Sequence, residues 1–186
     1  MKEDSFMAAP KIPYAQEGRE APEAKQVYEQ SRKIFGMVPN VVKLLGHSGP
    51  AAQGIGSLLN IYFTRLDLSP RIREIAYLTA ARCNDCAYCI GHHTLLGKKA
   101  GLTDEDISLL GLEGMGSSRF SEADRAVIRF SYETTKNVAA SDEAIEALKK
   151  NHDLKQVADI AFVVASANFI QRIGKNLGVQ LEMQAV

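Results

Sequence analysis

The chain has 186 residues, of which 46% are hydrophobic and 24% are charged, and its 22 basic and 22 acidic residues cancel. This length fits one domain with a hydrophobic core of its own. The balanced charge lacks the basic excess of a nucleic-acid-binding protein. The longest apolar run, residues 160–167, is too short for a membrane span, and residues 1–5 are polar, without a signal-like segment after them. We therefore expect a cytoplasmic protein that binds neither nucleic acid nor membrane.

Start and stop signals divide the chain into predicted helices. Residues 1–20 are polar, contain Pro10 and Pro13, and are expected to form an extended arm. Ser69-Pro70 is a strong helix start, because it combines a cap residue with proline at the first helical position. The predicted helices cover about residues 21–35, 39–45, 50–65, 70–82, 85–100, 103–110 and 121–137, a helix after Ser141, and residues 154–177.

The remaining segments do not change this helical pattern. Residues 111–118 are rich in Gly and Ser and form the expected internal loop. No segment shows a sustained alternation of apolar and polar residues between turn signals, as a strand would. The predicted fold is all-α, with residues 21–186 as a single domain and residues 39–110 as the core around the redox motif.

All three cysteines and two of the four histidines lie in residues 83–93. Three cysteines this close do not make the disulfide framework of a secreted protein, and they indicate redox or metal chemistry in a reducing compartment. Cys86, Cys89 and His93 have the spacing i, i+3 and i+7, which places them along one face of a helix. This face is the candidate functional site.

The position of Cys86 at a predicted helix start matters for its chemistry. After a cap at residues 84–85, the unpaired backbone N–H groups and the helix dipole stabilise a thiolate. A Cys-x-x-Cys pair there has a lowered thiol pKa and can close a disulfide. His93 lies one turn beyond Cys89 and could exchange a proton with it. Glu74, on the preceding helix, could face His93 and complete a relay from carboxylate to imidazole to thiol.

These residues resemble the motif of the AhpD-like alkylhydroperoxidases in the carboxymuconolactone decarboxylase superfamily. The motif consists of Glu74, then Cys86-Ala87-Tyr88-Cys89, then His93. Residues 39–48, 91–93 and 99–102 agree with it. The C-terminal Asn168-Phe169-Ile170-Gln171-Arg172, with residues 177–179, resembles the end of the peroxidase-related branch. The resemblance covers most of the chain from about residue 20.

The resemblance implies an all-helical subunit that assembles as a homo-oligomer, either a trimer or a hexamer, and reduces hydroperoxides. Cys89 would become the sulfenic acid, and Cys86 would be the proton donor and resolving thiol. Glu74 and His93 would form the proton relay. An external dithiol such as a lipoyl protein would reduce the disulfide, and no organic cofactor or metal would be needed. The sequence departs from the family at Tyr88, where the best-studied members have a histidine.

Several assignments around the pair have two interpretations. The helix dipole by itself favours Cys86 as the more acidic thiol, whereas the resemblance places the reactive sulfur at Cys89, and we follow the resemblance. Tyr88 could line the site and donate its hydroxyl into it, or it could be a packing residue. His92 could line the site or could equally be an interfacial or merely satisfied histidine. Cys83, an additional thiol relative to the family, is interpreted first as a small buried apolar residue. The alternatives are an off-pathway disulfide partner or a residue that lines the site.

Other functions fit parts of the same sequence. The pair could exchange disulfides or sense oxidant without peroxidase turnover. The three cysteines with His92 or His93 could bind zinc or part of an iron–sulfur cluster, although there is no fourth cysteine. A lactone-handling decarboxylase like the superfamily's namesake is the last alternative, although those members lack the cysteine pair.

Overall fold

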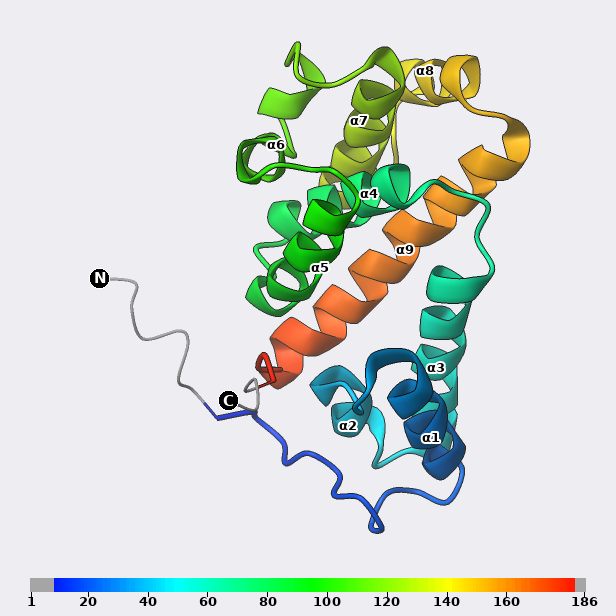
Figure 1. The fold of residues 1–186 in the computed structure, drawn as a ribbon, viewed down its shortest axis with the longest axis vertical. Helices are drawn as coiled ribbons and strands as arrows, with labels where there is room; N and C mark the ends of the chain where they lie inside the picture. The colour runs from blue at the N-terminus through cyan, green and yellow to red at the C-terminus, as the bar shows by residue number, and fades with distance from the viewer. Residues whose placement is uncertain (1–8, 183–186) are drawn as a thin grey trace. The chain divides into compact units, whose positions relative to one another are not determined.

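The computed structural model describes residues 9–182, and over this range the chain is all-α, with nine α-helices, a short 3-10 helix and no strand (Figure 1). The expected fold class is therefore confirmed. The helices are α1 (Ala24–Phe35), α2 (Asn40–Leu45), α3 (Gly49–Thr64), α4 (Pro70–Cys83), α5 (Ala87–Lys99), α6 (Asp104–Leu109), α7 (Glu122–Asn137), α8 (Asp142–Asn151) and α9 (Leu154–Leu177).

Cap residues in the sequence fix several of these limits. The Ser69 hydroxyl accepts a hydrogen bond from the N–H of Ile72 at the start of α4. Thr103 and Asp106 form a capping box at the start of α6, each side chain accepting from the backbone N–H of the other. Such caps satisfy N–H groups that the first helical turn leaves without partners. Gly36 ends α1 in a left-handed conformation with φ of 76°.

The residues group into two units, one formed by Leu66–Gln171 and the other by the chain on either side of it. In the flanking unit, α1 and α2 both pack on α3. Residues 9–20 form no helix there. They are held in part by the Tyr28 hydroxyl, which donates to the carbonyl oxygen of Ala15 at 3.1 Å.

In the central unit, α4 is the helix around which the others pack. Both α5 and α7 pack against α4, and α8 packs on α7 (Figure 1). Residues 74–81 of α4 are all buried. A helix buried on every side is normally apolar all round, since a buried charge must find a partner. The carboxylate of Glu74, buried in this segment, therefore needs a partner, which makes Glu74 a candidate functional residue.

Helix α9 carries a buried apolar stripe, formed by Ile160, Val163, Val164 and Ala167. Among the described helices it alone is long and apolar enough to cross a membrane by length and composition, a test that buried core helices also pass. The stripe accounts for its apolar composition, because a core-facing helix needs one.

Two local expectations need correction. The helix α5 begins at Ala87, not near Asp85, because Asp85 adopts a left-handed conformation (φ 49°) and Cys86 becomes the N-cap residue. Asp and Asn adopt this conformation more readily than other non-glycine residues. The expected loop 111–118 contains a 3-10 helix, Glu113–Met115, whose Gly114 is buried.

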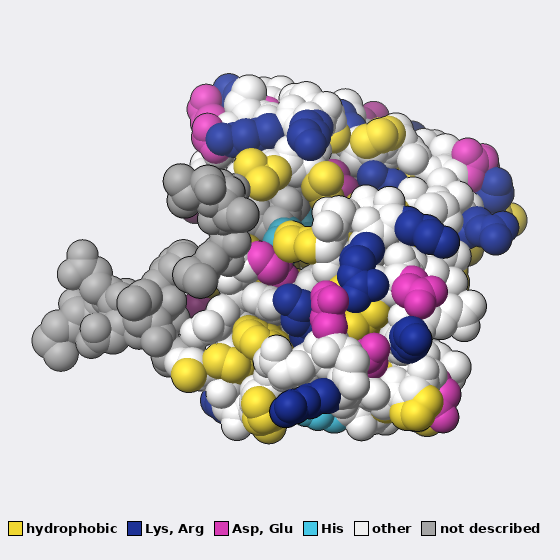
Figure 2. Space-filling view, turned by 60° about the horizontal axis from the view of Figure 1, so that its bottom comes forward, with side chains coloured by type: hydrophobic (Ala, Val, Ile, Leu, Met, Phe, Trp, Pro, Cys, Tyr) yellow, Lys and Arg dark blue, Asp and Glu magenta, His cyan; other side chains and the backbone are white. Residues whose placement is uncertain are grey.

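Surface charges of opposite sign lie close together. On the face drawn in Figure 2, the described basic and acidic side chains are interspersed, without a large area of one sign. Pairs such as Lys150 with Glu122, at 2.9 Å, and Lys155 with Asp67, at 2.8 Å, are well exposed. Exposed pairs of this kind contribute little to stability. This arrangement agrees with the zero net charge of the sequence.

Candidate active site

Cys86 and Cys89 are free thiols whose sulfur atoms lie 2.8 Å apart. Cys86 is the N-cap residue of α5 and Cys89 lies in its first turn. The two residues are only 1% and 2% exposed. Because a disulfide bond is about 2.05 Å long, a small movement of the two sulfurs is enough to close one. The pair thus has the geometry of a two-electron thiol site.

Glu74 of α4 and His93 of α5 form a buried pair. The distance between Glu74 Oε2 and His93 Nδ1 is 2.7 Å, and the side chains are 1% and 10% exposed. Arg73 Nε approaches the other carboxylate oxygen at 3.4 Å. The contact expected between Glu74 and His93 is therefore present. A carboxylate partner favours a proton on Nδ1, which leaves Nε2 as the nitrogen that can take up a second one.

Tyr77 lies between this pair and the cysteines. Its ring stacks on that of His93, with 3.5 Å between the centroids, and its hydroxyl donates to Cys89 Sγ at 3.8 Å. Tyr77 is 4% exposed. It was not among the residues expected at the site. Its spacing of i, i+3 from Glu74, which places both on one face of α4, is the signal that could have found it.

The ionisation of Cys89 depends on its contact with Cys86. The hydrogen bond with Cys86, burial, and the charge of Cys86 raise the pKa of Cys89 well above its ordinary value, while the Tyr77 hydroxyl acts in the opposite direction. Two groups coupled in this way titrate as a pair. The first ionisation is therefore favoured at Cys86, in agreement with the helix-dipole argument. Cys89 needs a base before it can act as a thiolate.

The other residues expected near the site have different surroundings. Tyr88 is 8% exposed, and its ring meets that of His92 edge-on at 4.7 Å. The two rings therefore pack against each other. Cys83 is the last residue of α4 and is half-buried, and its carbonyl oxygen accepts from Lys136 Nζ at 2.7 Å. Burial raises the pKa of Cys83.

A metal site at the three cysteines finds no support in the geometry. Between residues 9 and 182, no group of three or more His, Cys, Asp or Glu side chains is arranged to hold a metal ion. The sulfurs of Cys86 and Cys89 face each other, whereas structural zinc requires four ligands directed at one point.

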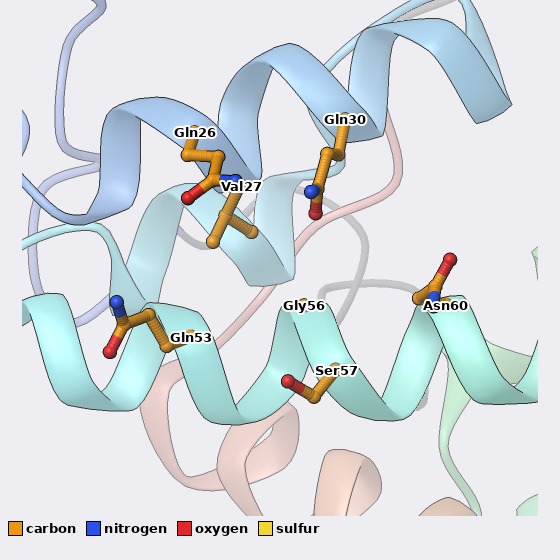
Figure 3. A pocket seen from close by; sticks show the side chains of 7 residues that line it. All are labelled: Gln26, Val27, Gln30, Gln53, Gly56, Ser57 and Asn60. Carbon is orange, nitrogen blue, oxygen red and sulfur yellow. The ribbon is translucent and has the colours of Figure 1, made fainter.

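A groove of about 420 Å³ lies between α1 and α3 in the flanking unit (Figure 3). Its walls consist of Gln26, Val27, Gln30, Gln53, Gly56, Ser57 and Asn60. These side chains offer hydrogen bonds to a ligand but contain no titratable group. The groove therefore has no acid or base for catalysis.

Comparison with known proteins finds a family profile that matches the central part of the chain. The sequence profile of the carboxymuconolactone decarboxylase family matches residues 57–129. This segment is similar to the carboxymuconolactone decarboxylase family. It contains the whole of α4 and α5, and with them Glu74, Tyr77, both paired cysteines and His93.

Individual relatives are distant in sequence but similar in fold. The uncharacterized protein YdfG of Bacillus subtilis (strain 168) is 23% identical over 132 residues, which cover 69% of this chain and 89% of YdfG. The debrominase Bmp8, as a cysteine-to-alanine variant in complex with 2,3,4-tribromopyrrole, has a TM-score of 0.76 at 17% identity, covering 95% of this chain and 94% of its own. The alkylhydroperoxidase AhpD core of an uncharacterized peroxidase-related protein from Ralstonia eutropha JMP134 has a TM-score of 0.72 at 18% identity, covering 94% of each chain. The expected resemblance to AhpD-like, peroxidase-related proteins is confirmed at the level of fold, and the family profile matches the segment that holds the site.

Proposed function

We propose that the protein is a thiol-dependent peroxidase that reduces hydroperoxides with the Cys86–Cys89 pair. One observation carries the proposal: two thiols with sulfurs 2.8 Å apart lie in a site that also holds a buried Glu74–His93 pair. Thiols in this arrangement can give two electrons to an acceptor and close a disulfide. A carboxylate–imidazole pair can transfer the proton that the reaction requires. The likeness to a peroxidase-related protein supports the same function.

The proposed cycle has three steps. The thiolate of Cys89 attacks the peroxide, the O–O bond breaks, and with one proton the products are a sulfenic acid and an alcohol. The thiol of Cys86 then attacks the sulfenic sulfur, so that an S–S bond forms and water leaves. An external dithiol, for which a lipoyl group is the expected chemistry, reduces this disulfide and becomes a disulfide itself.

Tyr77 and His93 support the assignment of Cys89 as the attacking sulfur. The Tyr77 hydroxyl donates to this sulfur, and His93 stacks on the same tyrosine. Because Cys86 and burial raise the pKa of Cys89, a base must remove its proton before it attacks. His93, whose Nδ1 is held by Glu74, has the required chemistry. Cys86 is then the resolving thiol.

Peroxide titration of the reduced protein tests this proposal. With dihydrolipoamide as the dithiol, the wild type should consume cumene hydroperoxide catalytically. Without the dithiol, stoichiometric peroxide should leave a Cys86–Cys89 disulfide that peptide mass mapping detects. Cys86→Ser should stop turnover and leave a sulfenic acid on Cys89 that dimedone traps. Wild-type protein that keeps both thiols contradicts the proposal, and a disulfide without turnover favours a disulfide oxidoreductase or an oxidant sensor.

A second candidate function is reductive dehalogenation. It is favoured by the likeness to the debrominase Bmp8, in which a variant lacking one cysteine was captured with 2,3,4-tribromopyrrole. Two thiols supply the electrons that this reaction needs: an aryl bromide and two thiols give the aryl–H product, a disulfide and hydrogen bromide. Incubating the reduced protein with a brominated pyrrole distinguishes the two functions. Bromide release coupled to the Cys86–Cys89 disulfide supports dehalogenation, and its absence alongside rapid peroxide consumption rejects it.

A further inference from the structure

The side-chain amides of Asn84 and of two residues of α9 meet at the turn that leads into Cys86. Asn84 follows the last residue of α4, and its Nδ2 donates to Asn168 Oδ1 at 2.9 Å and to Gln171 Oε1 at 2.5 Å. Both acceptors lie on α9, far along the chain from the cysteines. We refer to Asn84, Asn168 and Gln171 as the amide cluster. Its α9 members belong to the C-terminal stretch that resembles the peroxidase-related branch, and the proposed cycle uses neither of them.

The amide cluster is itself held by α7 and by the α4 backbone. Asn168 Nδ2 donates to Thr135 Oγ1 of α7 and to a carbonyl oxygen one turn earlier in α9, both at 3.0 Å. Gln171 is 1% exposed and contacts the end of α4 in either amide orientation. In one it accepts from Asn84, and in the other its nitrogen lies 3.2 Å from the carbonyl oxygen of Ala80. Hydrogen-bonded amides that are buried, as Gln171 is, or partly buried, as Asn84 and Asn168 are, resist displacement, because moving them leaves polar groups unpaired.

The turn that the cluster contacts is short. The N–H of Asn84 donates to Ala80 O and the N–H of Cys86 to Ala81 O, both at 3.0 Å. Asp85, between them, has a left-handed φ of 49°. That conformation costs a non-glycine residue on the order of 1 kcal/mol, so the surrounding structure must hold the turn in this form. The side chain of Asn84 is the point where α9 supplies that support.

We propose that the amide cluster positions Cys86, holding the turn so that the Cys86 sulfur stays within reach of Cys89. The inference rests on the proposed function, because it concerns the redox pair. A preorganised turn loses less conformational entropy when the disulfide closes. Removing an amide of the cluster therefore lowers the stability of the disulfide relative to the dithiol. The three amides are positioning residues that act through Cys86.

Equilibration of the pair with glutathione buffers measures this effect. Glutathione disulfide oxidises the two thiols and is reduced to two glutathione molecules. Asn84→Ala and Asn168→Ala should each lower the equilibrium constant for the Cys86–Cys89 disulfide about tenfold, which corresponds to a reduction potential about 30 mV less negative. The double variant should shift the constant no further than the larger single effect, because both substitutions remove the same contact.

A matched control lies on the same helix. Asn176 is an exposed asparagine of α9 whose amide donates to the carbonyl oxygen of Arg172, and Asn176→Ala should leave the equilibrium constant unchanged. Circular dichroism establishes that each variant is folded. If Asn168→Ala does not fold, Thr135→Val replaces it, since it removes the support of Asn168 and keeps its contact with Asn84. The expected shift then has the same direction and a smaller size.

The outcomes separate the two proposals. A wild type that forms no Cys86–Cys89 disulfide at any glutathione ratio overturns the proposed function, and this inference with it. A normal wild-type equilibrium with unchanged constants in folded Asn84→Ala and Asn168→Ala variants overturns only the role of the amide cluster. Shifts that add in the double variant also overturn it, because they show that Asn84 and Asn168 act independently.

Discussion

The rings of Tyr77 and His93 lie nearly parallel, with 13° between their planes and 3.5 Å between their centroids. The edge of the imidazole is bound by Glu74, and the hydroxyl of the tyrosine is directed at Cys89. Tyr77 therefore contacts both the carboxylate–imidazole pair, through His93, and the thiol pair, through Cys89. The two halves of the site are fixed relative to each other by this stack.

Tyr77→Phe retains the stack and removes only the hydroxyl. Because this hydroxyl lowers the pKa of Cys89, we expect the pKa to rise and alkylation of Cys89 at a fixed pH to slow about tenfold. The measurement is the pH dependence of iodoacetamide labelling in a Cys86→Ser background, where Cys89 has no thiol partner. Tyr132→Phe, on α7, is the control and should not move the profile. A profile unchanged by Tyr77→Phe would remove the tyrosine from the site.

Glu74→Gln keeps the shape of the side chain and removes its charge. His93 then loses the carboxylate that contacts its Nδ1 and completes the proposed relay, so we expect peroxide reduction to slow by about 10–100-fold. Stopped-flow single turnovers measure the rate, and thermal unfolding should show that the fold is retained. Glu146→Gln changes an exposed glutamate of α8, with 69% of its side chain accessible, and should have the wild-type rate. Equal rates for Glu74→Gln and wild type would exclude Glu74 from the relay.

Cys83→Ser tests whether the third thiol takes part. Burial raises the pKa of Cys83, which disfavours its reactive thiolate, so we expect peroxide consumption and the Cys86–Cys89 disulfide to be unchanged. Peptide mass mapping of the oxidised variant shows whether the Cys86–Cys89 disulfide still forms. The same variant tests the metal alternative. Stoichiometric zinc in wild-type protein purified without chelator, lost in Cys83→Ser, would support a metal site instead.

Glu133 joins α7 to the start of α8, accepting from Arg129 Nε at 2.7 Å and from the backbone and hydroxyl of Ser141 at 2.8 and 2.7 Å. Burial raises the pKa of Glu133, but these hydrogen bonds outweigh it and lower the pKa from 4.5 to about 2. A depressed folded-state pKa stabilises the fold above the unfolded-state value, and this stabilisation is lost as the pH falls toward the folded-state value.

Glu133→Gln should therefore lower the free energy of unfolding by about 2 kcal/mol at neutral pH, and by less as the pH falls toward about 2. Urea denaturation at several pH values measures the difference. Glu146→Gln again serves as the exposed control. An equal loss of stability for Glu133→Gln at neutral and acidic pH would mean that the charge of Glu133 does not contribute to the free energy of unfolding.

The helices could be predicted from the sequence because their ends are encoded locally. The hydroxyl of Ser69 and the capping box of Thr103 with Asp106 lie where their spacing predicts them. Gly36 ends its helix as expected. The limits of α5 were less accurate, because Asp85 can act either as a cap or as a left-handed turn residue. Only the backbone around it decides between the two roles.

The site was less fully predictable because it depends on contacts between helices. Glu74 was placed beside His93 from its distance to the cysteines, and the two are in contact. Tyr77 was missed because a tyrosine in a helical apolar pattern is usually a core residue, and its hydroxyl contact is set by the packing of α4 on α5. The amide of Asn84 likewise finds its partners on a helix that begins far along the chain.

The 2.8 Å separation of the cysteine sulfurs, at 1–2% exposure, also bears on how the enzyme would survive its own substrate. A sulfenic acid that meets a second peroxide becomes a sulfinic acid, which thiols cannot reverse. At Cys89 the thiol of Cys86 is already in contact, whereas another peroxide molecule must first enter a closed site. In the proposed cycle, condensation would therefore outpace hyperoxidation, and the catalyst would withstand oxidant bursts that permanently inactivate an enzyme with one exposed cysteine.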